Sequence, residues 1–126
     1  MPSEPLGILL ISGDHERAHY AFVLAAGAAA VGRAVVLFAT NEGSRALLED
    51  WSTLAGAGRD AAVRARGVAG LGELREAAIE LGARLIVCDA GLRMAGLTEA
   101  TLLPNVETAG VATFLEATRG GQLLTL

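Results

Sequence analysis

The sequence predicts a single-domain α/β protein, a three-layer sandwich in which a mainly parallel sheet of about five strands is flanked by helices. The length of 126 residues suits one domain that spans 1–126. Apolar runs such as Leu6–Ser12 are continuous rather than alternating, which is typical of strands covered on both faces. Strand and helix signals alternate along the whole chain, and this order favours parallel strands joined by right-handed crossovers.

The first strand and helix are the clearest unit. Leu6–Ser12 is the strand, and either Ser12 or Asp14 can cap the helix that follows. Small and apolar residues continue to Val31, where Gly32 ends the helix.

A second unit begins at Arg33–Ala39, which repeats the strand signature. Thr40–Gly43 is the expected turn, and Ser44–Trp51 reads as a short helix. From Ser52–Gly72 the chain is rich in Gly and Arg and has little periodicity, so we expect a loop that holds at most a helical turn and can act as a lid.

The third unit is a helix followed by a buried strand. One face of the helix is apolar and consists of Leu71, Leu74, Ala78 and Leu81. The helix is expected to end at Gly82. The strand Arg84–Cys88 comes next.

The last part of the chain predicts shorter elements. After Cys88 we expect a short turn or helix, and Thr98 is a plausible cap for a helix over Glu99–Leu103, before Pro104. The final helix presents Val111, Phe114 and Leu115, and the closing strand is Gln122–Leu126.

The first helix is apolar all round between His19 and Gly32, and such a helix is buried all round. One flank can pack on the sheet, and in so small a protein the other flank predicts contact with a second subunit. We therefore expect a homo-oligomer. The alternative is an Ala-rich helix that is tolerated in solvent.

Charge and cysteine content restrict the function class. Ten basic residues, all of them Arg, stand against fourteen acidic ones, and a formal net charge of −4 argues against nucleic acid as the partner. The single cysteine cannot form an internal disulfide, which suits a reducing cytoplasm. The N-terminus lacks the basic flank of a signal peptide, and the apolar stretch Tyr20–Val31 is too short to span a membrane.

Ligands of parallel α/β sheets gather beyond the carboxyl ends of the strands. Three predicted turns lie there: Ser12–His15, Thr40–Gly43 and Cys88–Gly91. Cys88 is the strong nucleophile among them.

The position of Cys88 allows two interpretations. Backbone N–H groups and the helix dipole favour the thiolate, Arg93 adds to this effect, and Asp89 opposes it by like-charge repulsion. Cysteine is also among the most buried residue types, so the strand could simply place a small apolar side chain in the core. Position alone leaves both interpretations open.

A second motif is the stretch from His15 to His19, which matches H-E-x-x-H, the pattern in which two His bind zinc and Glu16 activates water. The sequence has no third His, although Glu42 could complete a site. The alternative is an ordinary solvated first turn whose acidic residues complement the helix dipole.

Nucleotide motifs are absent, and we expect no cofactor and no metal. The loop carries Arg59, Arg64 and Arg66, which can receive an acidic partner or a small anion, or can simply be solvated. We expect the side chain of Trp51 to be an anchor in the core or in a subunit interface.

Three segments carry a family resemblance: Gly82–Asp89, Met94–Leu97 and Val106–Ala112. With the Ala-rich helix that ends at Gly32 and the turn at Gly43, they resemble the DsrE/DsrF-like family, most closely its peroxiredoxin-like branch. The resemblance extends over nearly the whole chain and is weakest at 52–72.

The resemblance implies a compact α/β sandwich that forms dimers, trimers or hexamers. It also implies that Cys88 carries sulfane sulfur as a persulfide, in sulfur oxidation or a sulfur relay, with TusA-like carrier proteins as partners. A chain with one cysteine must hand its sulfur to another molecule. Thiol peroxidases use T-x-x-C, and Leu85 replaces that Thr, so peroxidase activity is not expected.

The expected site combines this resemblance with the strand-end turns. Backbone N–H groups from Asp89, Ala90 and Gly91 would hold the anionic persulfide, with Arg93 assisting. Other pocket residues would come from the first two strand ends: Ser12, Gly13, Asn41 and Gly43. The alternative function is a non-catalytic binding or scaffold subunit with an inert Cys88, and a zinc hydrolase built on His15, Glu16 and His19 is more remote.

Overall fold

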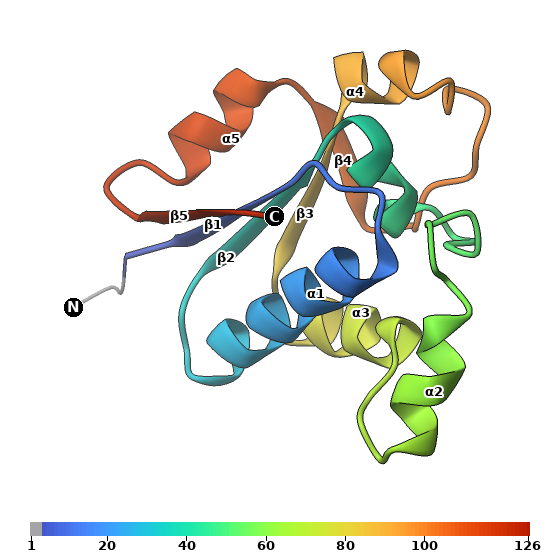
Figure 1. Cartoon of the computed structure of the whole chain (residues 1–126). Coiled ribbons are helices and arrows are strands. Elements are labelled where there is room, and N and C mark those ends of the chain that lie inside the picture. The colour runs from blue at the N-terminus through green and yellow to red at the C-terminus, as the bar shows by residue number, and fades with distance from the viewer. Residues whose placement is uncertain (1–3) are drawn as a thin grey trace.

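The computed structural model describes residues 4–126 and confirms the predicted α/β sandwich (Figure 1). Its sheet has five strands in the order β4-β3-β2-β1-β5, and all four strand pairs are parallel. In chain order the strands are β1 Leu6–Leu10, β2 Val35–Ala39, β3 Arg84–Cys88, β4 Val106–Ala109 and β5 Gln122–Thr125.

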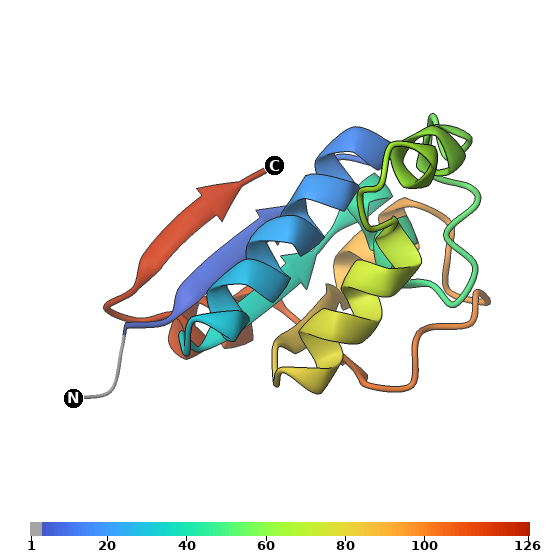
Figure 2. The same ribbon diagram turned by 90° about the horizontal axis from the view of Figure 1, so that it is seen from below.

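Helices cover the two faces of the sheet unequally. The helices α1 (His15–Ala30) and α3 (Leu71–Glu80) lie side by side on one face, as Figure 2 shows. The other face carries α5 (Val111–Ala117), which is only 7 residues long. We call these two faces the α1 side and the α5 side.

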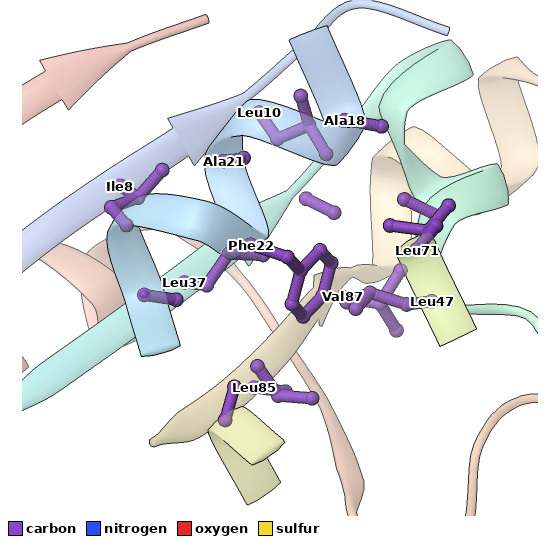
Figure 3. Close-up of a cluster of buried hydrophobic side chains, with 14 of the residues drawn as sticks. Ile8, Leu10, Ala18, Ala21, Phe22, Leu37, Leu47, Leu71, Leu85 and Val87 are labelled. Atoms are coloured by element: carbon purple, nitrogen blue, oxygen red, sulfur yellow. The ribbon is translucent and has the colours of Figure 1, made fainter. Parts of the chain in front are cut away.

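The main core lies between the sheet and the long helices (Figure 3). Phe22 of α1 is fully buried there against side chains from the three inner strands, among them Leu37 and Leu85. The α5 side has a smaller core, in which the rings of Phe38 and Phe114 stack with centroids 5.0 Å apart. The thicker layer therefore supplies most of the hydrophobic stabilisation.

Two connecting segments differ from the sequence predictions. The expected helix Ser44–Trp51 is instead a 3-10 helix, η1, which begins earlier, at Asn41, and ends at Leu47. The expected loop Ser52–Gly72 contains a helix of two turns, α2 (Arg59–Ala65).

The predicted helix over Glu99–Leu103 was wrong. Leu102 forms an antiparallel bridge with Leu48 instead, and the Leu103 N–H donates to the carbonyl oxygen of Leu47 at 3.0 Å. Five residues before Pro104 are too few to nucleate a stable helix, so pairing with the η1 segment is favoured. The turn after Cys88 does form a helix, α4 (Asp89–Met94).

The chain after Pro104 forms β4, a strand that the sequence did not predict. Within residues 4–126, no helix is long and apolar enough to cross a bilayer.

Candidate functional site

Cys88 ends β3 and caps the first turn of α4. Side chains of β3 alternate between the faces of the sheet, so Leu85 and Val87 point to the α1 side while Ile86 and Cys88 point to the α5 side. The thiol therefore lies on the thinly covered face, where Phe114 belongs to the same apolar cluster. The side chain is half-buried, and so it is not sealed in the core.

A backbone N–H group is aimed at the sulfur. The N–H of Gly91 donates to Cys88 Sγ with an N···S distance of 3.4 Å. This contact depends on how closely α4 approaches β2, because a Cβ at position 91 would lie 2.5 Å from the backbone N of Asn41 and would also overlap Thr40. Glycine permits this approach, so Gly91 lies against Asn41 at the sheet edge.

The charged neighbours of Cys88 are paired with each other. Arg93 Nη2 lies 3.0 Å from Asp89 Oδ2, one helical turn away, and both side chains are exposed. Ala90 is exposed between them. Because the charges of Arg93 and Asp89 largely offset each other, this pair exerts little net electrostatic effect on the thiol. Among the described residues, the hydrogen bond to the sulfur comes from the Gly91 N–H.

The remaining predicted pocket residues lie elsewhere on the carboxyl edge. Gly43 packs against the backbone of Leu10 and Ile11, and a Cβ at Gly13 would lie 2.7 Å from Glu42 Cβ. Ser12 and Gly13 line a cavity of about 550 Å³ whose other walls do not include Cys88; they are Asp14, Glu42, Arg45, Thr53 and Ala55. The predicted pocket is thus divided between a thiol on the α5 side and a cavity beside β1.

The H-E-x-x-H stretch forms a hydrogen-bonded cluster with α2. His15 is fully buried, and its Nε2 is 2.9 Å from Asp60 Oδ1. His19 Nε2 is 2.9 Å from the carbonyl oxygen of Ala69. The two rings stack at 5.6 Å, and Trp51 packs on His15 at 5.8 Å.

This arrangement does not provide a zinc site. Each Nε2 atom is engaged with an oxygen partner, and the described residues contain no group of three or more His, Cys, Asp or Glu side chains that could hold a metal ion. The first turn is also not simply solvated, since both His side chains are buried. The motif instead attaches the 52–72 segment to α1.

Asp60 completes the cluster, and the sequence analysis missed it. Its Oδ1 also accepts the Leu71 N–H at 2.8 Å, at the start of α3. Burial raises the pKa of this carboxyl, but the hydrogen bonds from Leu71 and His15 and the charge of Arg64 outweigh burial and lower the pKa overall. No local pattern could have identified Asp60, because its partners are 45 and 11 residues away in the chain.

Two of the loop arginines are paired rather than free. Arg59 Nη2 lies 3.3 Å from Glu16 Oε2, and Arg64 Nε lies 3.6 Å from Asp60 Oδ2. Arg59 Nη1 also lies 3.4 Å from His15 Nδ1. Since a guanidinium only donates, His15 accepts through Nδ1 and donates through Nε2 to Asp60.

Comparisons with known proteins agree with this fold. The model of the DsrE/DsrF-like family matches residues 6–126. The uncharacterized protein YrkE of Bacillus subtilis (strain 168) is 27% identical over 147 aligned residues, which cover 92% of each chain. The crystal structure of the YchN protein from E. coli superposes with a TM-score of 0.74 at 14% identity, over 98% of this chain and 100% of that one, a likeness of fold alone.

Proposed function

Because the chain belongs to the DsrE/DsrF-like family, whose members are related to sulfur relay, we propose that it carries sulfane sulfur as a persulfide on Cys88. The observation that supports this most directly is the half-buried thiol at the end of β3 with the Gly91 N–H 3.4 Å from its sulfur. A thiol in that position is open to an incoming sulfur and has a donor to stabilise its anion.

Loading is an exchange of sulfur without net oxidation. The Cys88 thiolate attacks the outer sulfur of a donor persulfide, a new S–S bond forms at Sγ, the donor S–S bond breaks, and the donor leaves as a thiolate. The Gly91 N–H and the other backbone N–H groups at the start of α4 favour the negative charge of the bound persulfide.

Unloading repeats the same step on the carried sulfur. An acceptor thiolate attacks the outer sulfur, takes it, and releases Cys88 as thiolate. The sequence contains no second cysteine, so the acceptor thiol belongs to another molecule. We propose a small TusA-like carrier protein as that partner, a cytoplasmic setting, and a homo-oligomer as the working form.

Intact-mass measurement after incubation with inorganic polysulfide tests this function. The wild-type chain is expected to gain one sulfur, with the adduct confined to the peptide that holds Cys88, and dithiothreitol should remove it. Cys88→Ser is the matched variant. An unchanged adduct in Cys88→Ser, or no adduct in a folded wild-type chain, would rule out the persulfide carrier.

A second candidate is a non-catalytic subunit with an inert Cys88, and it is favoured by the apolar cluster to which Cys88 belongs. The rate of thiol alkylation at neutral pH separates the two candidates. A carrier thiol reacts in the native chain, whereas an inert one reacts only after unfolding in urea.

A further inference from the structure

A cavity separate from the thiol lies where α2 approaches the N-terminal end of α3, on the α1 side (Figure 2). Its volume is about 480 Å³, within the range of about 300–1,000 Å³ that is typical of small-molecule sites. Much of its wall has no side chain beyond Cβ: Ala57, Gly58, Ala61, Gly70 and Gly72. The space between the two helices is therefore open and much larger than a single ion requires.

The charged side chains around this cavity favour a cation. Three of them are carboxylates, those of Asp60, Glu73 and Glu76, and one is the guanidinium of Arg64. Within residues 4–126, the carboxylates of Glu73 and Glu76 form no hydrogen bond or ion pair, although the charge of Glu76 acts on Arg75. An excess of carboxylates around a cavity concentrates cations in it.

Asp60 supplies a buried oxygen that lacks a hydrogen bond. The residue is 6% exposed, and its hydrogen bonds with His15 and Leu71 both use Oδ1. Oδ2 accepts none from the described part of the chain and has an ion pair at 3.6 Å with the exposed Arg64 side chain. A Cβ at Gly70 would lie 2.7 Å from Oδ2, so this oxygen borders the open space. A buried carboxylate oxygen without a donor favours a ligand that brings N–H groups.

Trp51 forms the aromatic part of the wall. Its side chain is half-buried, and its Nε1 lies 3.9 Å from the Cβ position of Gly72. The face of an indole ring attracts guanidinium and ammonium groups through its negative quadrupole. An indole beside carboxylates is therefore suited to an organic cation.

The spacing of the carboxylates favours an organic cation over a metal ion. The described residues contain no group of three or more His, Cys, Asp or Glu side chains that could hold a metal ion. A guanidinium is planar, has five N–H donors, pairs with carboxylates through two hydrogen bonds at once, and stacks on aromatic rings. It can therefore reach carboxylates on both α2 and α3.

We infer that this cavity binds an alkylguanidinium, whose plane lies against Trp51 and whose N–H groups donate to Asp60 Oδ2 and to the two glutamates. The ligand takes the place of the Arg64 guanidinium at Asp60. The inference goes beyond the proposed function and does not depend on Cys88, which lies on the α5 side.

Trp51 is the only tryptophan of the chain, so its emission reports on the cavity. N-acetyl-arginine amide, a capped arginine, should change this emission saturably, with a Kd of about 1 mM or lower. N-acetyl-citrulline amide has the same shape with an uncharged urea group and should bind about tenfold more weakly. No saturable change with the capped arginine, or equal binding of the two compounds, would overturn the inference.

Charge variants test which side chains bind the cation. Glu73→Gln and Glu76→Gln should each weaken binding of the capped arginine about twofold to fivefold, as for partly exposed ion pairs. Glu80→Gln is the matched control, because Glu80 lies on α3 but does not line the cavity. An equal loss in all three folded variants would mean that only the overall charge matters, and no specific site would remain.

Arg64→Gln tests the sign of the charge that the cavity accepts. It removes the cation that competes for Asp60 Oδ2, so the capped arginine should bind more tightly than it does to the wild type. Weaker binding in this variant, or saturable binding of inorganic phosphate that the variant abolishes, would identify an anion site and overturn the inference.

Agmatine, a free alkylguanidinium, identifies the source of the ligand. Tighter binding of agmatine supports the inference with a small metabolite as the ligand, and tighter binding of the capped arginine supports it with an arginine side chain of another protein. None of these results bears on the persulfide function, which is measured on Cys88 by mass.

Discussion

The polar side chains on the two sides of the sheet differ in burial and in the number of their hydrogen bonds. On the α1 side, His15 is fully buried with both ring nitrogens in contact with partners, and Asp60 is held by Leu71 as well. On the α5 side, Cys88 is half-buried, and one backbone N–H at 3.4 Å is its described polar contact. A buried, fully bonded cluster stabilises the fold, whereas a partly exposed, weakly bonded thiol remains available for reaction.

The largest expected effect on stability is at Asp60. Asp60→Ala leaves His15 Nε2 and the Leu71 N–H buried without their acceptor, and we expect the free energy of unfolding to fall by about 3 kcal/mol. Urea titration followed by circular dichroism measures it. Asp60→Asn keeps an acceptor oxygen and should recover part of the loss; sulfur loading of the folded protein should be the same in all three chains.

Gly91→Ala should affect the thiol side. The added Cβ overlaps Thr40 and the backbone of Asn41, so α4 must shift, and we expect about 1–3 kcal/mol of destabilisation. The shift also moves the N–H away from Cys88 Sγ, so the alkylation rate of the native thiol should change. Gly72→Ala is a suitable comparison, because its Cβ would meet only Trp51 Nε1, at 3.9 Å. An unaltered rate in folded Gly91→Ala would show that this N–H does not govern the thiol.

Acid should weaken the α1 side through Asp60. Its pKa is lowered in the folded state, so its contribution is complete above the ordinary aspartate pKa, about 4, and is lost as the pH falls through the lower folded pKa. The stability difference between wild type and Asp60→Asn should therefore shrink below pH 4. Urea midpoints of both chains between pH 7 and pH 2.5 measure this difference. A constant difference over that range would contradict the assignment.

Glu16→Gln should have the smallest effect. In a zinc hydrolase this residue would activate water, but here it pairs with Arg59 across 3.3 Å with both side chains exposed. Exposed pairs of this kind contribute about 0–1 kcal/mol, so stability and sulfur loading should barely change. A large loss of either would mean that the cluster has a role beyond attaching the 52–72 segment.

The three inner strands of the sheet could be predicted from the sequence because each is a continuous apolar run, as in Arg84–Cys88. The strand β4 was not, because Glu107 and Thr108 give it a polar composition at an edge where only one neighbour is needed. The direction of the Cys88 side chain could not be predicted from the sequence either. The strand is apolar throughout, so it has no alternation of polar and apolar residues to show that Cys88 points to the α5 side.

Contacts between residues far apart in the chain are the second feature that could not be predicted from the sequence. The residues from His15 to His19 match a metal motif in sequence, and what decides their role is Asp60 and Ala69, which lie 45 and 50 residues away. The position of Cys88 at a strand end could be read from the chain, but its contact with Gly91 depends on how closely α4 approaches Thr40, which packing determines.

Trp51 and Cys88 are the sole residues of their kinds in the sequence, and they are partly buried against the α1-side and α5-side cores respectively. The protein thus carries a native fluorophore next to His15 and a unique attachment point for an acceptor dye beyond the sheet. Energy transfer between them would report on loosening of the 52–72 segment, without introducing a single foreign residue.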